Sequence, residues 1–502
     1  MSTPHTVAAI HSVALVGANG SPIVVETDIK AGLPGVQIVG MGNKAINEAR
    51  QRVRSAVTNS KLTFPTRKIV VNLAPAELPK DGTHLDLPIA ISILVASGQL
   101  RTQEVASTVF AGELALDGLL RPIRGGISIT QAASALGATR VFLPAVTAQQ
   151  AQLVPGTLEV IPVTSLTEVF KILKGAQAPR PIAPFIPKIA PPKHTFDTLV
   201  GQERAKRALA ISAAGKHAIL LTGPPGAGKT ALCRALSSLL PPLTREESLE
   251  VTKLHSLTTP LSEPICHAPL RAPHHTTTLS ALIGGGVRPH PGDISLAHKG
   301  ILFLDELPEF PRAITEALRQ PLEDRSVTVS RLHGYISYPA DFLLAATMNP
   351  CACGYTGHPT VPCTCSGAQI AAYQKKVSKP ILDRIDLHLT VNSVDTEHIL
   401  HTKTLKEYQH SNLLKAVNTA RAQQKSRYKR SDYYNSYATL SEVASLFFIE
   451  ESAKKLAHTA AHTLSLSSRG LLKVFRIART IADLEGASTV TTQHISEALQ
   501  YR

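Results

Sequence analysis

A glycine-rich turn near the middle of the chain has residue types that bind phosphate groups. The segment LLTGPPGAGKTALCRALSSLL (220–240) reads as an apolar strand, a turn and an amphipathic helix. The turn fits the pattern G-x-x-x-x-G-K-S/T, in which glycines let backbone N–H groups surround phosphate oxygens. We expect Lys229 to reach the β- and γ-phosphates of a nucleotide and Thr230 to hold Mg²⁺. The candidate nucleotide-binding residues are Gly223, Pro224, Pro225, Gly226, Ala227, Gly228, Lys229 and Thr230.

Two acidic residues and an amide follow later apolar runs. ILFLDE (301–306) ends in Asp305, which can hold Mg²⁺ through water, and Glu306, which can polarise an attacking water molecule. AATMNP (345–350) contains Asn349, whose amide can hydrogen-bond both the γ-phosphate and that water. Combined with the glycine-rich turn, these residues predict hydrolysis of a nucleoside triphosphate.

Two arginines are candidates for stabilising the charge that develops on a γ-phosphate. Arg384 lies between apolar residues in LDRIDLHL (382–389), and we expect it to act on the nucleotide of a neighbouring subunit. The alternative for Arg384 is an intramolecular pair with Asp383 or Asp386. Arg469 lies in the first turn of a predicted helix in SSRGLLKVFRIART (467–480) and could also reach the nucleotide. Its alternative is a solvated helix residue.

Four of the six cysteines lie within CACGYTGHPTVPCTC (351–365). One tetrahedral Zn²⁺ can be held by four thiolates, here Cys351, Cys353, Cys363 and Cys365. The C-x-C spacing is tighter than usual, and His358 could replace one sulfur. Reduced, unliganded thiols and redox switching are the alternatives to a structural zinc. We expect Cys233 and Cys266 to be ordinary buried or loop cysteines.

Elements of two kinds must position these residues. Short apolar strands alternate with helices over residues 194–395, the pattern of a parallel α/β sheet, and the clearest strands are 217–223, 300–306 and 341–349. Two β-rich runs within 324–342 flank a short turn and predict a hairpin, with Arg331 and His333 near its tip. Residues 396–502 form a predicted helical lid, with helices at 404–426, 450–462, 468–484 and 492–500.

The amino-terminal part of the chain reads differently. Residues 1–175 mix β-rich runs at 22–29, 35–40, 67–73 and 109–116 with predicted helices at 43–57 and 85–97. Residues 176–193 are proline-rich and predict an extended linker. The expected organisation is therefore an α+β domain, a linker, an α/β core and a helical lid.

Composition restricts the class of protein. At 502 residues the chain is too long for one core, and its net charge of +15 favours phosphate-rich partners such as nucleic acids. No apolar run reaches the ~18–20 residues that a membrane span needs, and the amino terminus lacks the charges of a signal peptide. We expect a cytoplasmic, reducing location, where disulfides are unlikely to form.

The motifs together resemble those of the AAA+ ATPases. That resemblance implies ring assembly and a contact of Val200, Gly201 and Gln202 with the adenine of ATP. A closer resemblance is to the magnesium-chelatase-like ComM/YifB family. It rests on RAPHHTTTLSALIGGG (271–286), ISLAHKGILFLDELPEF (294–310) and MNPCACG (348–354), and on residues 25–41, 67–82 and 112–125. The resemblance covers nearly the whole chain. It implies a homo-hexameric, ATP- and Mg²⁺-dependent DNA helicase that moves branch points in homologous recombination, including natural transformation, with recombination proteins as further partners.

The first domain is similar to the ribosomal-S5-like fold, which is shared with Lon-type proteases. Those proteases place a nucleophilic Ser shortly after an Asp-Gly pair and a Lys base downstream. Here Thr83 and His84 follow Asp81-Gly82, and Ile127 lies near the position of the Lys, so we expect no proteolysis. The family's hairpin projects into the pore of the ring, which makes Arg331 and His333 candidates for DNA phosphate contact; the alternative is a solvated turn.

Three other functions compete with the helicase hypothesis. The first is a chelatase motor that inserts Mg²⁺ into a porphyrin with partner subunits. The second is an ATP-dependent protein remodeller or protease. The third is a DNA-binding scaffold with a degenerate ATPase, which the intact motor residues disfavour.

Overall fold

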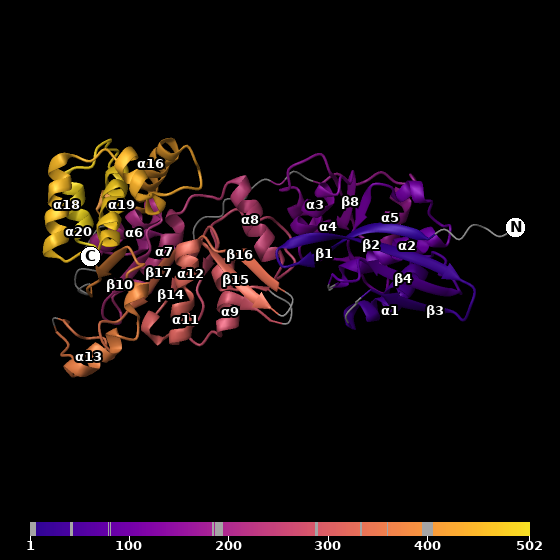
Figure 1. Ribbon diagram of the computed structural model, residues 1–502, viewed down its shortest axis with the longest axis horizontal. Coiled ribbons are helices and arrows are strands. Elements are labelled where there is room, and N and C mark those ends of the chain that lie inside the picture. Colours follow the sequence, from indigo (N-terminus) through magenta and orange to yellow (C-terminus); the bar gives the residue numbers. More distant parts are fainter. Residues whose placement is uncertain are drawn as a thin grey trace. The chain divides into compact units, whose positions relative to one another are not determined.

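The computed structural model describes residues 7–40, 44–78, 80, 82–182, 185, 194–286, 290–331, 334–358, 360–393 and 405–502. The chain divides into two compact units (Figure 1). Unit 1 contains Met1–Lys188 and Thr244–Cys266, and unit 2 contains Ile189–Leu243 and His267–Arg502. The segment Thr244–Cys266, which lies within the predicted core at 194–395, therefore belongs to unit 1.

Unit 1 is built on a seven-stranded sheet in the order β3-β4-β2-β1-β5-β8-β9. The bounds of its strands are β1 Ala8–Val16, β2 Asn19–Lys30, β3 Gly35–Val39, β4 Lys68–Ala74, β5 Thr108–Phe110, β8 Arg140–Pro144 and β9 Glu159–Val163. β2 pairs antiparallel with β1 and β4, and the other neighbouring strands are parallel. The predicted strands at 22–29, 35–40 and 67–73 are confirmed. The run predicted at 109–116 is divided between β5 and the short strand β6 (Glu113–Leu114), which pairs with β7 (Leu120–Arg121).

Helices cover both faces of this sheet. They are α1 Lys44–Asn59, α2 Asp86–Ala96, α3 Gly126–Ala135, α4 Ala145–Ala151 and α5 Leu166–Leu173. One hydrophobic core joins α1, α2 and α5 to one face, and a second joins α3 and α4 to the other. Consecutive residues of a strand point to opposite faces, so Phe142 of β8 enters the first core while Val141 and Leu143 enter the second.

The segment Thr244–Cys266 contains helix α8 (Arg245–Ser256), which packs against α3. The Gly125 N–H donates to the carbonyl oxygen of Ser256 at 3.0 Å, and the Lys253 ammonium donates to the Asn19 side chain at 3.0 Å. These contacts join residues far apart in the sequence. The apolar periodicity of α8 alone therefore could not reveal which unit it joins.

Unit 2 contains a five-stranded parallel sheet in the order β11-β14-β17-β10-β18. The strands are β10 Ile219–Thr222, β11 Leu270–Arg271, β14 Ile301–Leu304, β17 Leu343–Met348 and β18 Leu387–Thr390. The three predicted strands are confirmed as β10, β14 and β17. Because parallel strands have their carboxyl ends at one edge of the sheet, the residues that follow these three strands meet there.

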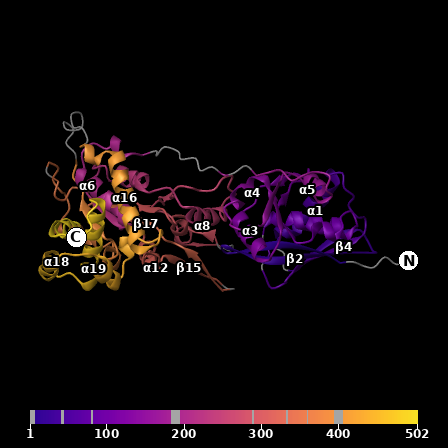
Figure 2. The ribbon, with the colours of Figure 1, turned by 90° about the horizontal axis from the view of Figure 1, so that it is seen from above.

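Helices surround this sheet and continue to the end of the chain. Within the core they are α6 Glu203–Gly215, α7 Lys229–Leu236, α9 Leu279–Ile283, α10 Asp293–Leu296, α11 Arg312–Ala317, α12 Arg319–Asp324, α13 Gly367–Gln374 and α14 Lys379–Leu382. The lid helices are α16 His410–Tyr428, α17 Leu440–Leu446, α18 Glu451–Thr463, α19 Ser468–Leu484 and α20 Thr492–Leu499. Figures 1 and 2 show α16 and α19 beside α6, and one hydrophobic core joins lid and sheet. The four predicted lid helices are confirmed, and α17 was not predicted.

The predicted hairpin is also confirmed. Strands β15 (Ser326–Arg331) and β16 (Gly334–Pro339) pair antiparallel, with Arg331 opposite Gly334. The side chain of Arg331 and the whole of His333 lie outside the described residues, so their contact with DNA stays a prediction. In the part of the chain that the structure describes, we find no helix with the length and apolar character needed to cross a membrane.

Candidate functional site

The loop from Gly223 to Gly228 connects β10 to α7. Gly226 and Gly228 have φ of 79° and 83°, a left-handed conformation that residues with a side chain rarely adopt. The space where a Cβ would lie is open at both positions. The Gly223 N–H donates to the Met348 carbonyl at 3.2 Å, which fixes the start of the loop to β17. The predicted sequence of turn and helix is therefore present, with room beside the two inner glycines.

Lys229 begins α7 and points back at the loop. Its ammonium donates to the carbonyl oxygens of Gly223 at 2.6 Å and Pro224 at 2.7 Å, and to Oδ1 of Asn349 at 3.1 Å. Burial lowers the pKa of Lys229, and the neighbouring charge of Asp305 acts in the opposite direction. The predicted cation and the predicted amide thus lie in direct contact.

Two hydroxyl groups hold the carboxylate of Asp305. Thr230 donates to Oδ2 of Asp305 at 3.0 Å, and Thr347 donates to Oδ1 at 2.6 Å. The Thr347 hydroxyl also accepts the N–H of Glu306 at 2.9 Å. Thr347 was missed from the sequence. It is a polar residue in an otherwise apolar strand, and the pairing of Leu304 with Ala346 places it beside Asp305.

Glu306 has an exposed side chain and a φ of 56°, which is unusual for a residue other than glycine. A backbone of this kind costs roughly 1–3 kcal/mol and persists only where its surroundings fix it. Here the Thr347 hydroxyl accepts the Glu306 N–H, and the Glu306 carbonyl accepts the N–H of Glu309 at 2.8 Å. The chain therefore holds Glu306 at the carboxyl edge of β14 with its side chain open to water.

The segment Val200–Gly201–Gln202 also reaches the loop. The Gln202 amide donates to the carbonyl oxygen of Asn392 at 2.6 Å and to that of Ala227 at 3.4 Å. The segment that the resemblance assigned to adenine contact thus joins the phosphate loop to the residues after β18.

The two predicted arginines lie together at Glu323 of α12. Arg384 pairs with the Glu323 carboxylate and donates to the Pro380 carbonyl at 2.7 Å. Arg469 lies 3.8 Å from the same carboxylate, and its side chain is 84% exposed. The alternative partners Asp383 and Asp386 were wrong for Arg384.

Asp386 has other partners. It pairs with Lys473 of α19 at 3.0 Å and with His217 at 3.1 Å. The chain that carries Arg384 is therefore tied to the lid helix that carries Arg469.

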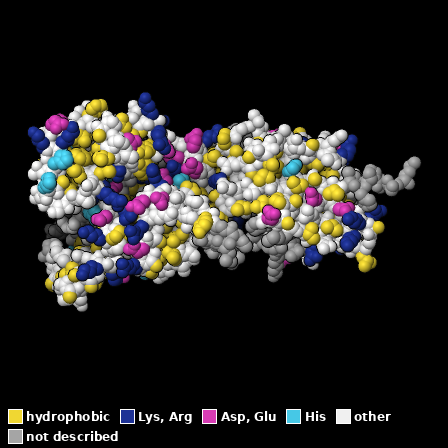
Figure 3. Space-filling view, in the orientation of Figure 1, with side chains coloured by type: hydrophobic (Ala, Val, Ile, Leu, Met, Phe, Trp, Pro, Cys, Tyr) yellow, Lys and Arg dark blue, Asp and Glu magenta, His cyan; other side chains and the backbone are white. Residues whose placement is uncertain are grey.

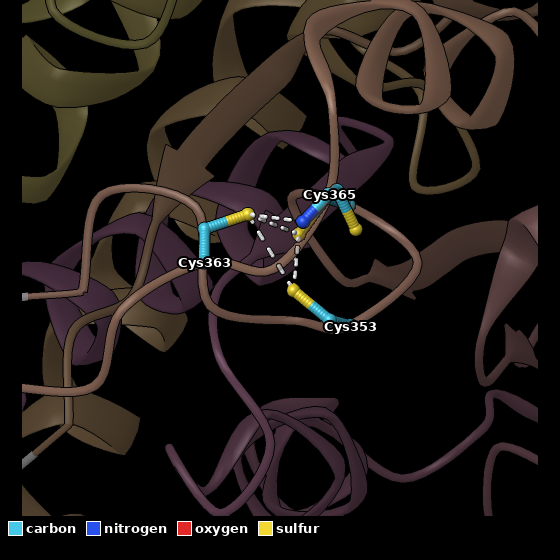
Figure 4. A group of neighbouring side chains, drawn as sticks. Cys353, Cys363 and Cys365 are labelled. Atoms are coloured by element: carbon cyan, nitrogen blue, oxygen red, sulfur yellow. Dashed lines mark hydrogen bonds between the residues drawn. The ribbon is translucent and has the colours of Figure 1, made fainter.

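The four clustered cysteines converge. Figure 4 labels three of them, Cys353, Cys363 and Cys365. Their sulfur atoms all lie within 4.8 Å of one another. The Sγ atom of Cys353 lies 3.3 Å from that of Cys351 and 3.5 Å from that of Cys363, and the Sγ atoms of Cys351 and Cys363 are 3.7 Å apart. Four sulfurs at ~2.3 Å from one tetrahedral Zn²⁺ would be about 3.8 Å apart, so the donor set fits that ion.

The four thiols do not share one pKa. Although a backbone hydrogen bond with Cys353 lowers it, hydrogen bonding to the Cys353 thiol and burial raise the pKa of Cys365 to about 11. Backbone N–H groups of Tyr355 and Thr364 lower the pKa of Cys353 to about 5, which favours the thiolate that binds metal. His358 is not among the grouped side chains; its Nδ1 accepts from the Val361 N–H at 3.0 Å. Cys233 is buried in the unit 2 core and Cys266 is partly buried, as expected.

The residues expected at a protease site in unit 1 do not form a Ser–Lys pair. The Thr83 hydroxyl donates to the Glu113 carboxylate, and His84 contacts the Val13 carbonyl at 2.9 Å. Ile127 is buried in α3. Asp81 lies outside the described residues.

Comparison with known proteins gives the family. The models "Subunit ChlI of Mg-chelatase", "Magnesium chelatase, subunit ChlI" and "Magnesium chelatase, subunit ChlI C-terminal" match residues 25–147, 195–399 and 409–502. The protein YifB of Salmonella typhimurium is 41% identical over 99% of this chain and 97% of its own length. The competence protein ComM of Haemophilus influenzae is 38% identical over the same shares of the two chains. The chain belongs to the ComM/YifB family.

Membership of the ComM/YifB family confirms the predicted resemblance. A 67 kDa magnesium-chelatase subunit of Heliobacterium mobile is a more distant relative, with 24% identity over 60% of this chain and 46% of its own. The mixed α/β units, the parallel sheet of unit 2 and the carboxyl-terminal helices accord with a magnesium-chelatase-like AAA+ fold. The family model at 195–399 includes the segment Thr244–Cys266, which folds with unit 1.

Proposed function

We propose that this protein is an ATP-driven, homo-hexameric DNA helicase that moves branch points in homologous recombination, including natural transformation, in the cytoplasm. One observation carries the proposal: Lys229, Thr230, Asp305 and Asn349 meet at one edge of the unit 2 sheet. In this arrangement the loop N–H groups and Lys229 bind the β- and γ-phosphates. Thr230 and, through water, Asp305 hold the Mg²⁺ that neutralises phosphate charge in this class of reaction.

The residues divide the hydrolytic step between them. Glu306 accepts a proton as water attacks the γ-phosphorus, and the bond from that phosphorus to the β–γ bridging oxygen breaks, which yields ADP and phosphate. Asn349 orients the water and contacts the γ-phosphate. Val200, Gly201 and Gln202 contact the adenine.

Arg384 and Arg469 act on the nucleotide of a neighbouring subunit in this proposal. Their guanidinium groups lie at one carboxylate, that of Glu323, and Arg469 is largely exposed. The Nε of Arg384 is buried and has no hydrogen-bond partner among the described residues. A γ-phosphate from the next subunit would replace Glu323 as the partner of both arginines. Such a head-to-tail contact forms a ring when the rotation from one subunit to the next closes, and we propose that it does so here.

Charge supports DNA as the substrate. The net charge is +15, and on the face in Figure 3 Lys and Arg side chains, with Asp and Glu side chains among them, lie on unit 2 around α11, α12 and α13; Arg319 pairs with Glu316 and Lys376 with Glu309. Exposed members of this region are Arg312, Arg319, Lys375, Lys376 and Lys379. The hairpin of β15 and β16 packs against α12, and we propose that Arg331 and His333 contact DNA phosphates. Similarity to a competence protein points to recombination proteins as partners.

The cysteine cluster and unit 1 have structural roles in this proposal. Cys351, Cys353, Cys363 and Cys365 hold one Zn²⁺ per chain, which fixes a loop too polar to hold a core, because the energy of metal binding becomes folding energy. Unit 1 has a ribosomal-S5-like, Lon-like fold without proteolytic activity. It serves in contacts with DNA, partners or neighbouring subunits.

A magnesium-chelatase-type motor is the second candidate, because three chelatase subunit models match the chain. One experiment separates the two. Purified protein is given ATP and a synthetic Holliday junction, with linear DNA and Lys229→Ala protein as controls. The helicase proposal expects DNA-stimulated hydrolysis and ATP-dependent separation of the junction arms. An ATP hydrolysis rate that DNA does not stimulate, together with an intact junction, would favour the chelatase motor or a protein remodeller.

A further inference from the structure

We infer that the cysteine cluster is a metal-dependent clamp on the phosphate loop, so that zinc binding and ATP binding strengthen each other. This inference rests on the proposed zinc and ATP sites and assigns them a coupling. Two sets of contacts join the cysteine cluster to the phosphate loop, and a third contact joins the two ends of the cysteine loop.

The first connection runs through the backbone. Asn349, whose Oδ1 accepts from Lys229 at 3.1 Å, is separated from Cys351 by Pro350 alone. Cys351 is fully buried, and its sulfur lies against those of Cys353 and Cys363. A metal bound to Cys351 therefore fixes the chain immediately beyond the amide that contacts Lys229.

The second connection is direct packing. The Gly354 N–H donates to the Cys351 carbonyl at 3.1 Å and so closes a turn that contains two of the four sulfur ligands. This turn lies on the phosphate loop, because a Cβ on Gly354 would be 2.6 Å from Cδ and 2.8 Å from Cγ of Pro225. A residue as small as glycine is needed for so close an approach. Its φ of 87° is also one that glycine adopts most readily.

The third contact joins the helix after the cysteine loop to Pro350, the residue before the loop. Helix α13 follows Cys365 directly, begins at the Ser366 cap and ends at Gln374. The Gln374 amide donates to the Pro350 carbonyl at 3.3 Å, and the neighbouring Tyr373 is buried. Both ends of the cysteine loop are thus held beside Asn349.

These contacts have a thermodynamic consequence. With the metal bound, the turn at Gly354 and the chain at Asn349 hold Pro225 and Lys229 in one arrangement. Without it, the four sulfur atoms have no shared partner, the order of this polar loop rests on the contacts of Gly354 and Gln374 alone, and the phosphate loop loses part of its support. If ATP prefers the ordered arrangement, zinc must favour ATP, and by thermodynamic linkage ATP must favour zinc by the same factor. We expect a coupling of about tenfold, within the usual range for linked sites.

Two equilibrium titrations measure the coupling in the full chain. The dissociation constant of a fluorescent ATP analogue is measured on zinc-loaded protein and on protein treated with a zinc-selective chelator. Zinc affinity is then measured by chelator competition with and without ATP and Mg²⁺. We expect zinc removal to weaken ATP binding about tenfold and ATP to tighten zinc binding by the same factor. Equal ATP affinity with and without zinc would overturn the inference.

Two glycine variants test the contact without removing the metal. Gly354→Ala places a methyl group against Pro225, whereas Gly357→Ala, in the same loop and also at a left-handed φ of 78°, meets nothing within 4 Å. We expect both proteins to keep one zinc and only Gly354→Ala to lose ATP affinity severalfold. Identical ATP affinities for the two variants would overturn the inference, even if zinc-free protein proves unfolded.

The proposals can fail separately. A folded wild-type protein that holds no zinc would refute the metal site. Zinc-loaded protein that binds no ATP would refute the proposed function. Zinc and ATP that both bind without mutual effect would refute the clamp alone.

Discussion

The hydroxyl of Thr347 offers a sharp test of the geometry around the two acidic residues. Thr347→Val keeps the shape of this buried side chain but removes the donor to Asp305 at 2.6 Å and the acceptor for the Glu306 N–H at 2.9 Å. A hydrogen bond to a charged group contributes ~1.5–3 kcal/mol. If that energy serves only the transition state, hydrolysis should slow by about 10- to 150-fold. The unsatisfied N–H of Glu306 adds to the loss.

The assay is steady-state ATP hydrolysis over a series of Mg²⁺ concentrations, with Thr347→Ser as the matched control. Valine should lower kcat and raise the Mg²⁺ concentration that gives half-maximal rate, because Asp305 is no longer held. Serine keeps the hydroxyl and should stay near the wild-type values. Wild-type turnover and Mg²⁺ dependence in the valine protein would refute the reasoning. Equal defects in both proteins would assign the effect to packing instead of the hydroxyl.

Other variants test stability and chemistry. Burial alone would raise the pKa of Asp341, but the charges of Lys216 and Lys299 hold this pKa well below its usual 3.8. The stability that the Asp341 carboxylate contributes is therefore present at neutral pH and is lost as the pH falls below 3.8. Asp341→Asn should cost ~3–5 kcal/mol in denaturant unfolding, because a buried pair is broken, and a loss below 1 kcal/mol would contradict this. Burial raises the pKa of Asp86 to about 6, so its contribution is present at low pH and is lost as the pH rises through 6. Asp86→Asn should remove this slope from melting curves between pH 4 and 8, and an unchanged slope would show that other groups cause it. Glu306→Gln should bind ATP normally but hydrolyse it ~10²–10⁴-fold more slowly in single-turnover assays, and a normal rate would exclude Glu306 as the base.

Residues with a local signature could be predicted from the sequence. A short apolar run directly precedes each part of the ATP site, namely the phosphate loop, the pair Asp305 and Glu306, and Asn349. The residue types within each short segment are enough to indicate its chemical role. The strands and lid helices were predictable for the same reason, because alternation and helical periodicity are local. The β1 strand (Ala8–Val16) shows the limit: its buried and exposed residues alternate only as far as Ser12, and the next two residues, Val13 and Ala14, are buried as well.

Features that depend on strand register or distant packing could not be predicted. Thr347 meets Asp305 only because β14 and β17 pair in one particular register. Glu323 was missed as the partner of Arg384 because it comes from a helix distant in the sequence. The segment Thr244–Cys266 joins unit 1 through contacts with Asn19 and Gly125, which no pattern within the segment reveals.

A subunit-mixing experiment tests the central claim most directly. In the proposal, one copy supplies Lys229 and the next supplies Arg384, so Lys229→Ala and Arg384→Ala rings should each be inactive in ATP hydrolysis and Holliday-junction migration. When equal amounts are mixed and allowed to exchange, about a quarter of the contacts in a head-to-tail ring regain both residues. The account predicts a return of DNA-stimulated hydrolysis toward about a quarter of the wild-type rate, with measurable junction migration. Mixed rings that stay inactive although exchange is demonstrated, or Arg384→Ala rings that are fully active alone, would contradict it.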